Sequence, residues 1–153
     1  MRLVDIHNLT VNFPQHEGTV QAVRGVSWHL DAGESLGIVG ESGSGKSVTC
    51  MALLRLLREP PAKITAGRME LAGENMLTAD RRKLASIRCR VAAMVFQDPM
   101  TAFDPVFTIG HQIIETIQAH REVSTAGAKS EAASLLAKVE IKNPAAVLES
   151  YPH

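Results

Sequence analysis

The sequence has no excess of either charge, few cysteines and no long apolar stretch. Its 153 residues carry 16 basic and 16 acidic side chains, so nothing indicates the basic face of a nucleic-acid-binding protein. Cys50 and Cys89 lie far apart and have no ligand-like spacing with a histidine, which favours reduced thiols over a disulfide framework or a metal site. No apolar run approaches the ~20 residues of a membrane helix, and the N-terminus has no signal-peptide pattern. We therefore expect a cytosolic chain that reaches a membrane only through a partner.

The apolar pattern predicts strands in the first part of the chain and helices at its end, which is an α/β class. Strands are expected at 2–13 (as an edge strand), 19–30, 36–39 and 91–96, with a hairpin over 67–77 that turns at 72–75. Helices are expected at 46–59, 79–90, 109–120 and 127–141, with a short last helix opened by Asn143-Pro144.

A glycine-rich loop follows the predicted strand at 36–39. Gly40, Gly45, Lys46 and Ser47 match the pattern G-x-x-x-x-G-K-[ST]. Glycines let the backbone approach a phosphate chain, and the N–H groups at the start of the following helix attract anions. Lys46 is expected to reach the β- and γ-phosphates and Ser47 to ligate Mg²⁺. The predicted nucleotide contacts are Gly40, Ser42, Gly43, Ser44, Gly45, Lys46, Ser47 and Val48.

Two stretches together indicate a family. "GESLGIVGESGSGKSVT" at 33–49 is followed by "VAAMVFQDPMTAFDP" at 91–105. The pair resembles the ATPase subunits of ABC transporters, above all the group that powers import of peptides and, in some members, nickel or glutathione. The resemblance runs from Leu3 to His153 and implies a partial ATP-binding domain of the P-loop NTPase type. Its parts would be an antiparallel β region at 1–34, a P-loop core with a hairpin insert at 35–99, and the Q-loop with the start of the helical subdomain at 100–153.

The resemblance also implies roles for single residues. Phe13 matches the aromatic residue that stacks on adenine; the alternatives are His16, Trp28 or a plain buried aromatic. Gln97 matches the glutamine that reaches toward Mg²⁺ and the attacking water, which gives it a catalytic and a metal-binding role. The alternative for Gln97 is a polar strand end.

Partners follow from the same resemblance. Residues 98–108 are expected to face a transmembrane permease subunit at the inner face of the cell membrane, and a second ATP-binding subunit is expected head to tail. The family usually shows S-L-N-P where this chain has Ala102-Phe103-Asp104-Pro105. Val48 replaces a threonine of many relatives, which keeps the backbone N–H but removes a hydroxyl. No nucleic acid is expected.

The elements that this family uses for hydrolysis do not occur in the sequence. There is no L-S-G-G signature, and the apolar run at 145–149 ends in an acid but lacks the preceding Asp. His153 is the chain end and does not match the switch histidine. We expect a truncated product or a fragment of a longer subunit, which binds ATP and does not sustain its hydrolysis alone.

Two other classes are weighed against this prediction. A soluble P-loop protein, such as a nucleotide kinase or a DNA-repair ATPase, is expected to contain an arginine-rich lid or a long coiled coil. Neither pattern is visible in the sequence. A non-catalytic, nucleotide-dependent binding subunit is compatible with the residues present, because all of them serve binding.

Overall fold

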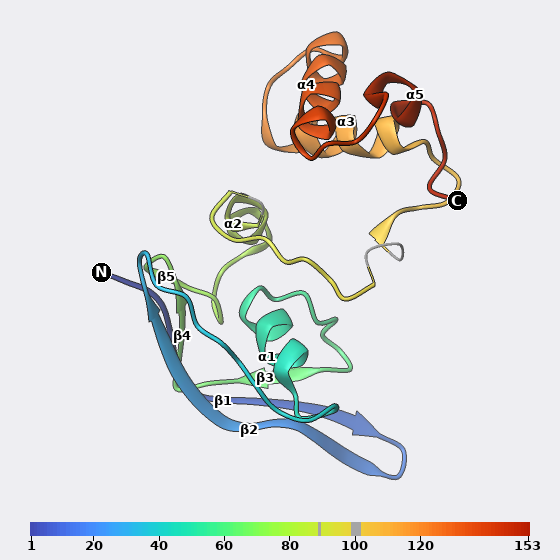
Figure 1. Cartoon of the computed structure of the whole chain (residues 1–153). Helices are drawn as coiled ribbons and strands as arrows, with labels where there is room; N and C mark the ends of the chain where they lie inside the picture. Colours follow the sequence, from blue (N-terminus) through green and yellow to red (C-terminus); the bar gives the residue numbers. More distant parts are fainter. Residues whose placement is uncertain (89, 99–101) are drawn as a thin grey trace. The chain divides into compact units, whose positions relative to one another are not determined.

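The computed structural model describes residues 1–88, 90–98 and 102–153, and these form two compact units, Met1–Ala93 and Met94–His153 (Figure 1). Cys89 and residues 99–101 of the predicted partner loop lie outside the described residues.

An antiparallel sheet makes up most of the first unit. Its strands are β1 (Arg2–Gln15), β2 (Gly18–Asp31), β3 (Lys63–Thr65), β4 (Arg68–Leu71) and β5 (Glu74–Asn75). The strand order is β2-β1-β4-β5, and β3 also pairs with β1. The prediction that β1 is an edge strand was wrong, because β2 pairs with one side of it and β3 and β4 with the other. The predicted hairpin is confirmed, with Ala72 and Gly73 at positive φ between β4 and β5.

A bulge in β1 brings all of its core residues to one face. The buried apolar residues of this strand are Val4, Ile6, Leu9 and Val11. Strict alternation would place the second pair on the face opposite the first. Asn8 adopts a left-handed φ of 54°, and the register with β2 shifts between Ile6 and Leu9. The extra residue reverses the parity of the strand, so both pairs point into the core.

Helix α1 (Lys46–Leu53) packs against β1, β2 and β4 and buries Ala52 and Leu53. The prediction of a helix to residue 59 was wrong. Arg55 adopts a φ of 52°, and Arg88, directly after α2 (Arg81–Ile87), donates Nε to the carbonyl oxygen of Leu54 at 3.0 Å and Nη2 to that of Arg55. The guanidinium therefore takes carbonyl oxygens that a longer helix would have used internally.

The apolar segments Leu36–Val39 and Val91–Phe96 are not strands, contrary to the prediction. Apart from a single bridge at Ala92, neither pairs with another segment among the described residues. Val39 is 92% exposed and Val95 is 90% exposed. An apolar run becomes a strand only where a neighbour completes its hydrogen bonds, and these two segments have none within the described chain.

The second unit holds α3 (Ile109–His120), α4 (Thr125–Lys138) and α5 (Pro144–Leu148), which confirms the predicted helices with small shifts of their ends. Thr108 and Ser124 cap α3 and α4 through their hydroxyl oxygens. A Cβ atom at Gly110 would lie 2.5 Å from the carbonyl oxygen of Leu148, so glycine permits the close packing of α3 on α5. Among the residues of this unit that the structure describes, the buried ones are Gly110, Ala128, Ala132 and Leu148.

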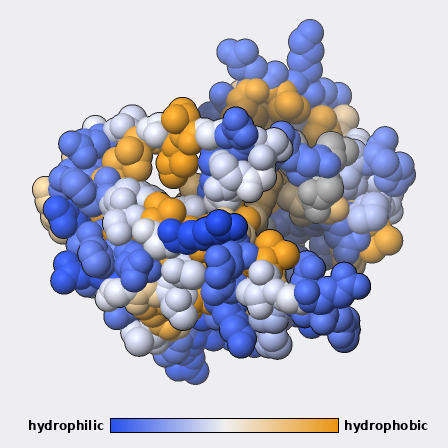
Figure 2. Space-filling view, turned by 90° about the horizontal axis from the view of Figure 1, so that it is seen from below, coloured by the Kyte–Doolittle hydropathy of each residue, from blue (hydrophilic) through white to orange (hydrophobic). Residues whose placement is uncertain are grey.

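The face seen in Figure 2 is mostly hydrophilic, with apolar side chains in smaller groups between the polar ones. Among the described residues, no helix combines the length and the apolar character needed to cross a membrane.

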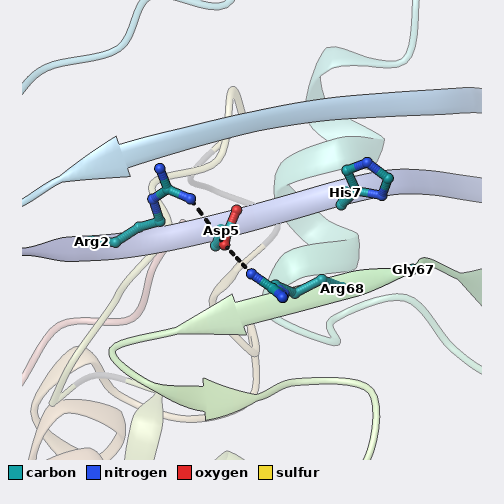
Figure 3. A pocket seen from close by; sticks show the side chains of 5 residues that line it. All are labelled: Arg2, Asp5, His7, Gly67 and Arg68. Carbon is teal, nitrogen blue, oxygen red and sulfur yellow. Dashed lines mark hydrogen bonds and ion pairs between the residues drawn. The ribbon is translucent and has the colours of Figure 1, made fainter.

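Two arginines share one carboxylate on the surface of the sheet. Oδ2 of Asp5 on β1 accepts from Nη1 of Arg2 at 3.2 Å and from Nη1 of Arg68 on β4 at 3.0 Å (Figure 3). These side chains line a shallow hollow together with His7 and Gly67. The hydrogen bond from Arg68, and to a smaller extent the contact with Arg2, lowers the pKa of Asp5 below its ordinary value.

We predict that Asp5→Asn destabilises the chain more at pH 7 than at pH 3. Because the pKa of Asp5 is lower in the folded than in the unfolded chain, the carboxylate stabilises the fold above its ordinary pKa. This stabilisation is lost as the pH falls through the lowered value. Urea midpoints of both proteins across this pH range measure it. The difference should shrink in 1 M salt and in an Arg68→Met background; a difference independent of pH would contradict the assignment.

Candidate nucleotide-binding site

The glycine loop leads from the segment at 36–39 directly into α1, as the motif predicts. Gly43 has a φ of 80° and Gly45 a φ of 90°, in the left-handed region that favours glycine. A Cβ atom at Gly45 would lie 2.3 Å from the carbonyl oxygen of Ala22 on β2, whereas one at Gly43 would meet nothing within 4 Å. The loop therefore lies against the sheet at Gly45 and stands clear of its surroundings at Gly43.

The Lys46 side chain folds back over this loop. Its Nζ donates to the carbonyl oxygens of Gly40 at 2.8 Å and Glu41 at 2.7 Å, and it lies 3.4 Å from Oγ of Ser44. All of these acceptors are neutral. An anionic oxygen adds a charge–charge attraction that a neutral carbonyl oxygen lacks, so an anion at the loop competes well for the ammonium group.

The first turn of α1 presents backbone donors beside Lys46. Gly45 is the N-cap and supplies no side-chain oxygen to this turn. The first hydrogen bond inside the helix runs from the N–H of Thr49 to the carbonyl oxygen of Gly45 at 2.8 Å. The N–H groups of Lys46, Ser47 and Val48 thus have no partner within the helix and point out of its positive end. An anion is favoured at this position.

Two hollows border the loop. One of about 350 Å³ is lined by residues 21–24 and Val26 of β2 with Gly43 and Ser44. The other, of about 370 Å³, is lined by residues 26–28 and 36–40 with Ser44, Lys46 and Thr49. Backbone and side-chain donors of the loop therefore face space that a phosphate chain can enter.

The exposed Ser47 hydroxyl fits the predicted metal role, because it lies in the first turn of α1 beside the loop. Among the described residues, no group of three or more His, Cys, Asp and Glu side chains could hold a metal ion. A Mg²⁺ ion at Ser47 would thus take its other ligands from phosphate oxygens and water.

The predicted contacts Phe13 and Gln97 belong to segments other than the loop. Phe13 pairs with Val20 near the tip of the β1–β2 hairpin and does not line either hollow. Trp28, an alternative to Phe13, does line the larger one, and its indole Nε1 is buried without a hydrogen-bond partner among the described residues. Gln97 is exposed and belongs to the second unit. Ser42 is exposed in the loop.

The family model described as ABC transporter matches residues 23–152. The chain belongs to the ABC transporter family. The match includes the glycine loop, α1, Gln97 and the three C-terminal helices. Of the predicted site residues, only Phe13 lies before it.

Among curated relatives of this ABC transporter chain, several are named for peptide transport. It is 44% identical to a probable peptide ABC transporter ATP-binding protein of Sinorhizobium fredii, over 99% of this chain and 45% of the relative. It is 40% identical to the oligopeptide transport ATP-binding protein OppD and 41% identical to the dipeptide transport ATP-binding protein DppD, both of Bacillus subtilis. Each alignment covers 99% of this chain, and respectively 42% and 45% of the relative. The chain therefore spans less than half the length of these relatives.

One contact in the loop was missed by the sequence reasoning. Oγ1 of Thr49 donates to the carbonyl oxygen of Gly45 at 2.9 Å, so this side chain holds the carbonyl at the start of α1. The signal was present in the sequence, because a threonine four residues after a helix N-cap can bond back to it.

We predict that Gly45→Ala destabilises the chain more than Gly43→Ala. Both substitutions place a side chain at positive φ, which costs about 1–2 kcal/mol. Only Gly45→Ala adds a collision with Ala22. Urea unfolding of the variants measures the difference. Equal losses would show that the loop can move away from β2 without cost.

Proposed function

We propose that this chain is the ATP-binding part of a subunit that energises an ABC importer of peptides or related small solutes. The observation that carries the proposal is the position of the Lys46 ammonium group and the free N–H groups of α1 at the same loop. The names of the relatives support peptides as the cargo.

In this proposal, phosphate oxygens replace the backbone carbonyl oxygens to which the Lys46 ammonium group is hydrogen-bonded. Lys46 leaves the carbonyl oxygens of Gly40 and Glu41 for oxygens of the β- and γ-phosphates. The N–H groups from Gly43 to Val48 donate to the β-phosphate, and the positive end of α1 adds to the attraction. When bound at Ser47 and Gln97, Mg²⁺ supplies charge that offsets the negative oxygens.

Adenine is proposed to stack on Phe13. Trp28 is the alternative that the hollow beside Lys46 supports, because its ring lines that space. Either ring would contact the face of the base and would not contact the phosphates. The loop therefore remains the part that selects a triphosphate.

Hydrolysis is proposed to belong to the assembled, longer protein. Gln97 can orient a water molecule but is a poor base at neutral pH. A positioned general base contributes about 10²–10⁴-fold to the rate, and the 153 residues include no L-S-G-G signature and no acidic pair after an apolar strand. We propose that a second ATP-binding subunit completes the site head to tail.

The membrane partner is proposed to bind at residues 98–108, at the inner face of the cell membrane. In the described part of this loop, Val106 is 68% exposed and Phe107 is 45% exposed. These two neighbouring side chains offer apolar area that a contact with another protein would bury. The permease of the importer is the partner that this family implies.

We predict that Lys46→Ala in the full-length subunit weakens Mg-ATP binding about 10–100-fold. The side chain supplies a hydrogen bond from a cation to phosphate, and such bonds contribute about 1.5–3 kcal/mol. Lys63→Ala, an exposed lysine on β3 of the same unit, is the matched control and should leave the affinity unchanged. Equal affinity of Lys46→Ala and the parent protein would contradict the assignment.

Phosphate release measured beside this titration separates an ATPase subunit from a non-catalytic binding subunit. An ATPase subunit binds ATP and turns it over when complete, and Lys46→Ala abolishes the turnover. A non-catalytic binding subunit retains ATP affinity without release even at full length. That second result would overturn the proposal of an energising subunit.

A further inference from the structure

The side chain of Gln112 holds the loop that precedes its own helix. Its Oε1 accepts from the N–H of Asp104 at 2.9 Å, and its Nε2 donates to the carbonyl oxygens of Asp104 at 2.9 Å and Phe107 at 3.1 Å. Both N–H groups and the oxygen of the amide are thus hydrogen-bonded to backbone atoms of the loop. This arrangement needs an amide, because the loop presents one donor and two acceptors.

Other contacts complete the shape of this loop. Oδ1 of Asp104 accepts from the N–H of Val106 at 3.1 Å, a turn in which the side chain replaces a backbone acceptor. The Phe107 ring stacks on the His111 ring of α3, with centroids 4.8 Å apart and an interplanar angle of 19°. Aspartate at 104 therefore forms a turn that an asparagine side chain can also form.

The loop is also continuous with the helices behind it. Thr108 caps α3, and the N–H of Ile109 donates to the carbonyl oxygen of Ser150 at 2.9 Å. Gly110 packs against Leu148 of α5. Through Gln112, the conformation of residues 104–107 is thus tied to the start of α3, and the start of α3 is tied to the end of α5.

We propose that Gln112 is a positioning residue that holds residues 104–107 in the conformation that binds the permease. This inference rests on the proposed function, in which residues 98–108 contact that subunit. Val106 and Phe107 are large apolar residues exposed in the described part of the loop, and Gln112 bonds to backbone on both sides of Val106. A partner then meets an ordered apolar surface and does not have to order the loop on binding.

Loss of these hydrogen bonds reduces the population of the binding-competent loop, and the apparent affinity falls by the same fraction. For the loss of three hydrogen bonds partly replaced by water, we expect the affinity for the permease to fall about tenfold. Gln112 is not among the predicted nucleotide or Mg²⁺ contacts, so ATP affinity should be unchanged.

The test compares variants of the full-length subunit for binding to the permease in detergent and for ATP affinity. Gln112→Ala removes all three bonds, and Gln112→Glu keeps the acceptor but places a carboxylate against two carbonyl oxygens. Gln118→Ala is the matched control on the same helix. We expect the alanine and glutamate variants at position 112 to bind the permease about tenfold more weakly with unchanged ATP affinity, and Gln118→Ala to bind normally.

A further variant, Val106→Asp, separates this inference from the proposal on which it rests. If Val106→Asp weakens permease binding and both Gln112 variants do not, the loop contacts the permease but Gln112 does not position it. If Gln112→Glu behaves as the parent protein while Gln112→Ala loses permease and ATP binding together, the side chain only supports the fold. If Val106→Asp leaves binding unchanged, the loop is not the contact, and both proposals fail.

Discussion

The close approach of Gly45 to the carbonyl oxygen of Ala22 is the constraint on which the phosphate loop depends. The loop can lie against β2 only because no Cβ atom separates the two backbones. This contact fixes where α1 begins, since Gly45 is its N-cap, and α1 then packs its buried face on β1, β2 and β4. The bulge at Asn8 brings the apolar residues of β1 to one face of the sheet. The positions of the sheet, the loop and the start of α1 therefore depend on one another.

Elements formed by local patterns were predicted well from the sequence. The hairpin at β4 and β5 follows from its turn at 72–75, and the helices of the second unit follow from apolar spacing. Elements that depend on distant contacts were not predicted. α1 ends early because Arg88 takes carbonyl oxygens at its C-terminus, and the apolar segments at 36–39 and 91–96 have no strand beside them among the described residues.

In the candidate site, too, the features set by local sequence were predicted and those set by distant contacts were not. The motif placed the glycines, Lys46 and Ser47 correctly at the start of a helix, because sequence spacing alone determines a loop of this length. Phe13 and Gln97 rest on the family resemblance and remain predictions, since each lies on a different element from the loop. Gln112 could not be found from local pattern, because its two partner residues, Asp104 and Phe107, lie up to eight residues before it in an irregular loop.

The central claim is that the triphosphate binds at the backbone donors of residues 43–48 and at the Lys46 ammonium group. Titration of the isotope-labelled full-length subunit with Mg-ATP, followed by amide and lysine side-chain NMR, tests it most directly. The largest shifts should fall on the N–H groups of residues 43–48 and on Nζ of Lys46, with little change at Arg2, Asp5 and Arg68 on the sheet surface. Shifts concentrated at the sheet surface, with the loop signals unchanged, would contradict the account.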